Sequence, residues 1–191
     1  VVHAFLRPHI QAAAQKYQVT VICNAADKHL LQDVKARVIL LPIERNPAPL
    51  KDLCILWQLF IFFRRERFDI VHSIMPKTGM LSMCAAWLAG VAIRIHTFTG
   101  QVWVTKSGVR RKFLKFLDGL IGAFSTCSLA DSPSQRDFLV AQKVLPAKKI
   151  RVLGAGSICG VDPIRFHPDN DIKKNIRSKL GIAPTAKVVL F

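Results

Sequence analysis

Acidic residues are scarce in this chain of 191 residues: 12 Asp and Glu stand against 28 Lys and Arg, which gives a formal net charge of +16. Such a charge points to anionic partners, namely nucleic acid, phosphates or an acidic membrane surface. However, the chain has a single Tyr, and no helix-turn-helix, zinc-finger or RNA-recognition signature occurs. We therefore expect no nucleic-acid partner, because such binding needs stacking platforms or a recognition motif.

Paired cysteines and long apolar runs are also missing. The five cysteines, at positions 23, 54, 84, 127 and 159, form no Cys-x-x-Cys pair. This predicts neither a disulfide scaffold nor a zinc site, and buried thiols in a reducing compartment are the simpler interpretation. The longest apolar run, residues 53–63 with Gln58 as its interruption, is too short for a membrane-spanning helix, which takes about 20 residues.

The usual nucleotide-binding and hydrolase fingerprints are absent as well. No Gly-x-Gly-x-x-Gly follows a strand, and the chain has no Walker loop, His-Glu-x-x-His or Gly-x-Ser-x-Gly. What the sequence does contain is a regular alternation of β-branched runs with helical stretches. Continuous apolar strands in such an alternation predict an α/β fold, with a parallel sheet covered by helices on both faces.

The expected elements follow from hydrophobic periodicity and from helix start and stop signals. We expect strands at residues 19–24, 38–43, 68–73, 93–97, 125–129 and 149–153. We expect helices at residues 3–16, 50–67, 78–89, 108–123 and 172–180, and another that begins at Ser132. Ligands of parallel sheets collect at the carboxyl ends of the strands. Those ends are Asn24 and residues 72–77, 96–101 and 154–157.

These strand ends hold the candidate site residues, and each has a simpler interpretation. Lys77, in Pro76-Lys77-Thr78-Gly79, can form an anion site with backbone N–H groups at a helix start, or can be an exposed lysine in an ordinary turn. His96 can donate to a sugar hydroxyl or a phosphate, or can be a hydrogen-bonded core histidine. The glycines of residues 154–160 permit a close ligand approach or a hinge, or form a flexible connection.

The helix expected at residues 108–123 is basic and amphipathic. Cations of this helix and of the loop before it alternate with apolar residues; they are Lys106, Arg110, Arg111, Lys112 and Lys115. Such helices lie on anionic lipid, where each cation near the surface contributes about 1 kcal/mol. We expect these five residues to contact a membrane. The alternative is a solvated face on a helix that packs on the core.

Several motifs, taken in order, resemble a known family. They are Phe-Asp-Ile-Val-His at 68–72, Pro-Lys-Thr-Gly at 76–79, Arg-Ile-His-Thr-Phe-Thr-Gly at 94–100, the Ser-rich segment 128–139 and Gly-Val-Asp…Arg-Phe at 160–166. In this order they resemble the N-terminal half of a retaining family 4 glycosyltransferase of the GT-B type, of the kind that builds bacterial surface polysaccharides. The resemblance implies two Rossmann-like domains across a cleft, of which the N-terminal one binds the acceptor and the C-terminal one the nucleotide-sugar donor.

The resemblance also implies an activity and partners. It implies a retaining hexosyltransferase that moves a hexose or N-acetylhexosamine from a nucleotide sugar to a polyprenyl-diphosphate-linked saccharide, without a metal or other cofactor. Members of this family attach to the inner face of the membrane through basic and apolar surface of the N-terminal domain. The implied location is therefore cytoplasmic, peripheral on an anionic membrane surface.

The resemblance assigns roles to particular residues. His96 matches the family histidine that reaches the donor sugar near its anomeric centre, and is the expected catalytic residue. Thr97, Thr99 and Gly100 belong to the same loop and, with Lys77, are expected to bind substrate. Many members have a second histidine where this chain has Thr99, which puts a mechanism with two histidines in doubt.

The expected domains are an acceptor-binding domain at residues 1–165, with its first strand before Val1, and a segment at 166–191 that holds a linker and the first strand of a donor domain. The strand expected at 187–191 can instead join the edge of the first sheet. Without a donor domain we expect the chain to be inactive alone. Two other classes stay open: an inactive domain that only binds a membrane or a partner, and a UDP-sugar epimerase of GT-B architecture.

Overall fold

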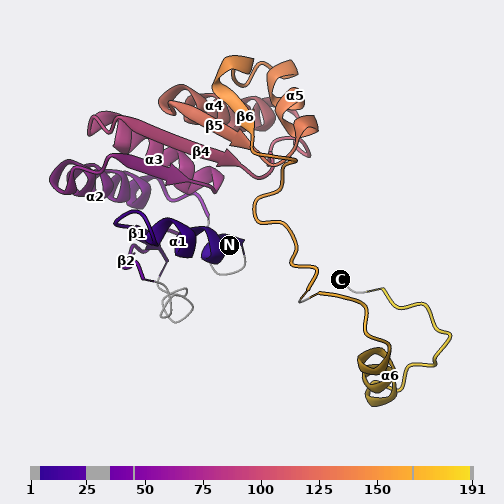
Figure 1. The fold of residues 1–191 in the computed structure, drawn as a ribbon. Helices are drawn as coiled ribbons and strands as arrows, with labels where there is room; N and C mark the ends of the chain where they lie inside the picture. The colour runs from indigo at the N-terminus through magenta and orange to yellow at the C-terminus, as the bar shows by residue number, and fades with distance from the viewer. Residues whose placement is uncertain (1–4, 25–34, 45, 165, 190–191) are drawn as a thin grey trace. The chain divides into compact units, whose positions relative to one another are not determined.

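The computed structural model describes residues 5–24, 35–44, 46–164 and 166–189. The chain consists of two compact units, Val1–Cys159 and Gly160–Phe191. The first unit contains two parallel sheets, drawn in Figure 1. One sheet pairs β1 (Thr20–Cys23) with β2 (Arg37–Leu40), and the other has the order β3 (Ile70–Ser73), β4 (Ile93–Phe98), β5 (Cys127–Ala130), β6 (Ile150–Val152).

Helices alternate with these strands and flank the sheets, which confirms the predicted α/β class. They are α1 (Arg7–Ala14), α2 (Pro49–Glu66), α3 (Pro76–Leu88), α4 (Gly108–Phe124) and α5 (Pro133–Ala141). Helix α3 packs between α2 and α4. Helix α2 buries Ile55, Leu59 and Phe63 in the core, a spacing of four that keeps one face inward. No helix in the described part of the chain is long and apolar enough to cross a membrane.

Two helix ends show how the sequence sets the boundaries. The predicted start of α5 at Ser132 is confirmed, because Ser132 caps the helix: its Oγ accepts a hydrogen bond from the backbone N–H of Gln135 at 3.1 Å. At the carboxyl end of α4, Lys149 Nζ donates to the carbonyl oxygens of Gly122, Ala123 and Ser125, each at 3.1 Å. These are groups that a helix leaves without intrahelical partners. Lys149 itself ends a short 3-10 helix (Ala147–Lys149). The expectation that it begins the last strand is therefore wrong, since β6 begins at Ile150.

The second unit contains the helix α6 (Asn170–Lys179), which Asp169 caps through the backbone N–H groups of Asp171 and Ile172. Residues 187–189 form no strand, and residues 190 and 191, which complete the predicted terminal strand, lie outside the described residues. Arg165, at the predicted domain boundary, also lies outside them. The predicted linker, donor-domain strand and missing first strand therefore stay predictions.

Candidate functional site

The carboxyl ends of β3 and β4 bring the predicted segments 72–77 and 96–101 together. The register pairs Ser73 with His96, and successive side chains of a strand point to opposite faces. On one face, Ser73 Oγ lies 2.9 Å from His96 Nδ1, and on the other, His72 Nε2 lies 2.8 Å from Thr97 Oγ1. The strand ends thus carry two histidine–hydroxyl pairs, one on each face of the sheet.

His96 lies under the first turn of α3. Its exposed fraction is 1%, and its ring meets that of Phe98 edge-on at 4.6 Å between centroids. The ring fills the space beside Gly79, where an added Cβ would be 2.5 Å from His96 Cε1. Burial, followed by the nearby His72, lowers the pKa of His96 to about 3, so the imidazole is neutral at physiological pH. The geometry is that of a core histidine, bonded to a serine, and its catalytic role stays a prediction.

Lys77 does not project freely from the strand-to-helix turn. Its Nζ forms an ion pair with Asp52 Oδ1 at 2.7 Å and donates to the carbonyl oxygen of Asn46 at 2.5 Å. Burial favours a higher pKa for Asp52, but hydrogen bonds from Lys77 and Ala48 and the charge of Lys77 lower that pKa overall. The ammonium group expected to meet a substrate therefore connects the first turns of α2 and α3.

Two of the other predicted substrate residues, Thr99 and Gly100, lie in the loop after β4. The expectation that Thr97 belongs to the same loop is wrong, because Thr97 lies within β4. Thr99 is half-buried and Gly100 is exposed, so both present polar atoms at the edge of the sheet. Thr97 is only 7% exposed and lies against His72. The side-chain nitrogen of Gln101 is buried, and no hydrogen-bond acceptor faces it within the described ranges. Of the residues predicted to bind substrate, Thr99 and Gly100 are the accessible ones.

Trp103 anchors this loop, and sequence reasoning missed it. Its exposed fraction is 1%, its Nε1 donates to Asp118 Oδ2 of α4 at 2.7 Å, and it stacks on Phe138 of α5 at 5.5 Å. Burial raises the pKa of Asp118 to about 6, and the bond from Trp103 partly opposes that rise. The available signal was the position of Asp118, which falls one turn from Leu114 and Ile121 on an apolar helix face.

The five predicted membrane cations divide into three sets by their surroundings. Arg111 Cζ and Lys115 Nζ each lie 5.6 Å from the ring centre of Trp103, so their charges face an internal ring. Lys106 is half-buried. Arg110 and Lys112 are exposed. The exposed apolar residues beside these two cations are Val109, Phe113 and Phe116. We call these five exposed residues the α4 surface.

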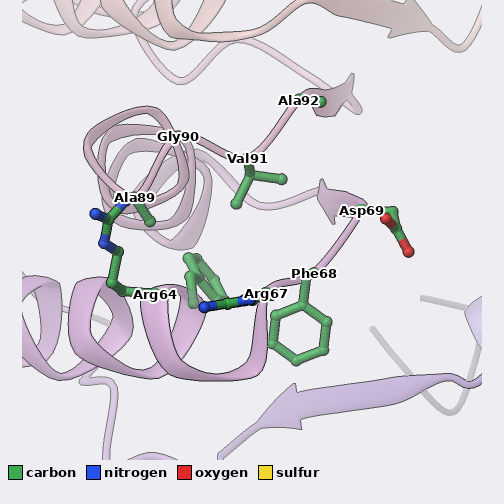
Figure 2. A pocket seen from close by; sticks show the side chains of 9 residues that line it. Arg64, Arg67, Phe68, Asp69, Ala89, Gly90, Val91 and Ala92 are labelled. Atoms are coloured by element: carbon green, nitrogen blue, oxygen red, sulfur yellow. The ribbon is translucent and has the colours of Figure 1, made fainter.

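A separate cavity lies at the opposite ends of the strands, just before β3 and β4 (Figure 2). It has a volume of about 450 Å³. Its lining residues are Phe63, Arg64, Arg67, Phe68, Asp69, Ala89, Gly90, Val91 and Ala92. The carboxyl ends of α2 and α3 meet here, and their partial negative charge favours cations. Arg64 and Arg67 therefore complement helix ends, and this cavity is distinct from the candidate site.

The chain belongs to the glycosyl transferase 4-like domain family, whose model matches residues 11–156. It is 28% identical over 166 residues to the capsular polysaccharide biosynthesis glycosyltransferase CapM of Staphylococcus aureus, with 87% of this chain and 44% of that protein covered. It is 27% identical over 168 residues to the UDP-Gal:alpha-D-GlcNAc-diphosphoundecaprenol alpha-1,3-galactosyltransferase of Escherichia coli, with 85% and 42% covered. The chain thus spans less than half the length of these relatives.

Solved structures share the fold. Anabaena Alr3699/HepE in complex with UDP-glucose aligns with a TM-score of 0.66 at 14% identity, over 94% of this chain and 45% of that one. UDP-GlcNAc 2-epimerase from Neisseria meningitidis, bound to UDP-GlcNAc, aligns with a TM-score of 0.57 at 16% identity, over 95% and 54%. The resemblance to a family 4 glycosyltransferase of surface polysaccharide synthesis is confirmed by the family and the relatives.

Proposed function

We propose that this chain is the acceptor-binding domain of a retaining hexosyltransferase. The enzyme moves a hexose or N-acetylhexosamine from a nucleotide sugar to a polyprenyl-diphosphate-linked saccharide. The observation that carries the proposal is the family match over residues 11–156. A relative named for a UDP-galactose donor and a diphosphoundecaprenol acceptor supports the substrate classes. The activity belongs to the complete enzyme that contains this domain.

The carboxyl edge of β3 and β4 is the proposed place of transfer. The Thr99 hydroxyl and the exposed backbone of Gly100 can hydrogen-bond sugar oxygens. The neutral ring of His96 holds the first turn of α3 in place through its contact with Gly79. We propose that no metal or other cofactor takes part, and that oriented hydrogen bonds and the basic surroundings stabilise the leaving diphosphate.

Transfer of label tests this function. The complete enzyme is incubated with radiolabelled UDP-hexoses and an undecaprenyl-diphosphate-linked sugar, and label is expected in the lipid phase with the anomeric configuration of the donor. The His96→Ala variant is expected to lose most of its turnover, because the support under α3 and the partner of Ser73 are removed. The matched control is His167→Ala, since His167 is exposed and lies in the second unit.

Three results would count against these assignments. Failure of every UDP-sugar to label the lipid, under conditions where the enzyme is folded, contradicts the transferase. Epimerisation of a free UDP-sugar without any acceptor supports the epimerase instead. Near-normal turnover of His96→Ala leaves the transferase standing but removes His96 from its mechanism.

We propose further that the α4 surface docks on the anionic inner face of the membrane. Val109, Phe113 and Phe116 follow one another at helical spacing, with Arg110 and Lys112 beside them. Apolar side chains that enter the headgroup region and cations that meet anionic lipid are the two components of interfacial binding. A cytoplasmic, peripheral location follows from this proposal.

Liposome sedimentation tests the docking. Vesicles that contain phosphatidylglycerol are expected to bind the protein, binding is expected to fall with salt, and Arg110→Glu/Lys112→Glu is expected to abolish most of it. The matched control is Lys148→Glu/Arg151→Glu, which makes the same change in net charge at two other exposed cations. Equal loss in both double variants would show that net charge, and not the α4 surface, drives binding.

A further inference from the structure

In the second histidine–hydroxyl pair, His72 with Thr97, one of the two residues is exposed to solvent. Thr97 is only 7% exposed, whereas residue His72 is exposed at the end of β3. The ring of His72 is held by the 2.8 Å hydrogen bond between its Nε2 and Thr97 Oγ1. Within this pair, His72 is therefore the residue that a ligand can reach, and Thr97 fixes its ring.

A second imidazole, that of His9 in α1, acts electrostatically on His72. His9 Nε2 lies 2.5 Å from the carbonyl oxygen of Ile158, so this nitrogen carries the proton and donates. The pKa of His72 is lowered, first by partial burial of its ring and then by the electrostatic effect of His9. Segments distant in the sequence thus contact one another through His9, which also acts electrostatically on His72.

Among the residues that the structure describes, only half of the hydrogen-bonding capacity of His72 is used. A neutral imidazole has one donor and one acceptor nitrogen, and Nε2 is engaged with Thr97. Across the described residues, no protein group bonds His72 Nδ1. A sugar hydroxyl both donates and accepts hydrogen bonds, so it can pair with a neutral ring nitrogen. A charged diphosphate is bound more strongly by a cation.

We propose that His72 contacts the acceptor, with its Nδ1 hydrogen-bonded to a hydroxyl of the acceptor sugar and its ring oriented by Thr97. This inference rests on the proposed transferase function and adds a residue to it. It also gives the two histidines at the carboxyl ends of β3 and β4 different roles. His96 supports α3 from the protein interior, and His72 binds the acceptor sugar.

Steady-state kinetics of the complete enzyme test this role. His72→Ala is expected to raise the KM for the lipid-linked acceptor roughly tenfold, the effect of one lost hydrogen bond, and to leave the KM for the nucleotide sugar unchanged. Two conservative variants separate contact from structure, because the asparagine amide takes the place of Nδ1 and the glutamine amide reaches that of Nε2. His72→Asn is expected to recover the acceptor KM, and His72→Gln is not.

The outcomes are distinguishable. If only His72→Gln recovers the acceptor KM, the role of His72 is to hold Thr97, and the inference is wrong. An unchanged acceptor KM in His72→Ala also overturns it, while transfer by the unsubstituted enzyme leaves the proposed function intact. Absence of transfer in the unsubstituted enzyme contradicts the proposed function itself. Thermal unfolding of each variant checks that the fold is retained.

Discussion

Replacement of Trp103 by alanine is expected to lower the free energy of unfolding by about 3–5 kcal/mol, the usual cost of truncating a buried tryptophan. The ring is 1% exposed, stacks on Phe138 and lies under the charged groups of Arg111 and Lys115. The substitution also leaves the buried carboxylate of Asp118 without its donor. Urea denaturation followed by far-UV circular dichroism measures the change.

Trp57→Ala is the matched control, because this tryptophan is 59% exposed on α2. Its loss is expected to change the free energy of unfolding by less than about 1 kcal/mol. Trp103→Phe separates the two contributions, since it retains a ring to stack on Phe138 and removes only the N–H donor to Asp118. If the Trp103→Ala protein were as stable as the Trp57→Ala protein, the conclusion that Trp103 anchors the loop after β4 would be wrong.

Gly79→Ala is expected to destabilise the domain by roughly 1–3 kcal/mol, the typical cost of overpacking a core. Alanine normally favours a helix over glycine by about 1 kcal/mol, so a loss here reverses the ordinary sign. The reason is that the new Cβ would be 2.5 Å from Cε1 and 2.8 Å from Nδ1 of the His96 ring. That ring is held by Ser73 and Phe98 and has little room to move. Thermal and urea unfolding give the difference.

A second glycine provides the control. At Gly119 of α4 an added Cβ meets only the carbonyl oxygen of Val144, at 3.6 Å, which is ordinary contact. Gly119→Ala is therefore expected to stabilise the domain by up to about 1 kcal/mol. A double-mutant cycle adds the decisive test, because Gly79→Ala should cost little in a His96→Ala background. If the cost is the same in both backgrounds, the contact with His96 is not its cause.

Most helices and strands of the first unit could be predicted from local sequence. The strand expected at 93–97 is β4 (Ile93–Phe98), and the helix expected at 50–67 is α2 (Pro49–Glu66). Short apolar runs, prolines at helix starts and the Ser132 cap are signals contained within a few residues. The association of segments 72–77 and 96–101 also followed, since all carboxyl ends of a parallel sheet lie at one edge.

The faces and partners at that edge could not be predicted. The register pairs His96 with Ser73 and not with His72, which places the two histidines on opposite faces of the sheet. A shift of one residue would place both on the same face. The partner of Lys77 is Asp52, 25 residues earlier, and that of Trp103 is Asp118, 15 residues later. Such contacts depend on tertiary packing, which hydrophobic periodicity does not encode.

The hydrogen bonds from Lys149 decide when, during synthesis, the carboxyl end of α4 obtains all of its donors. The carbonyls of Gly122, Ala123 and Ser125 obtain this donor only from a residue that leaves the ribosome after α5 and the following turn. The carbonyl of Phe124 between them accepts instead from Arg94 Nε of the earlier strand β4. Until then water is the donor available to the three carbonyls that Lys149 bonds. A nascent chain that stops before Lys149 therefore leaves these three carbonyls without their protein donor.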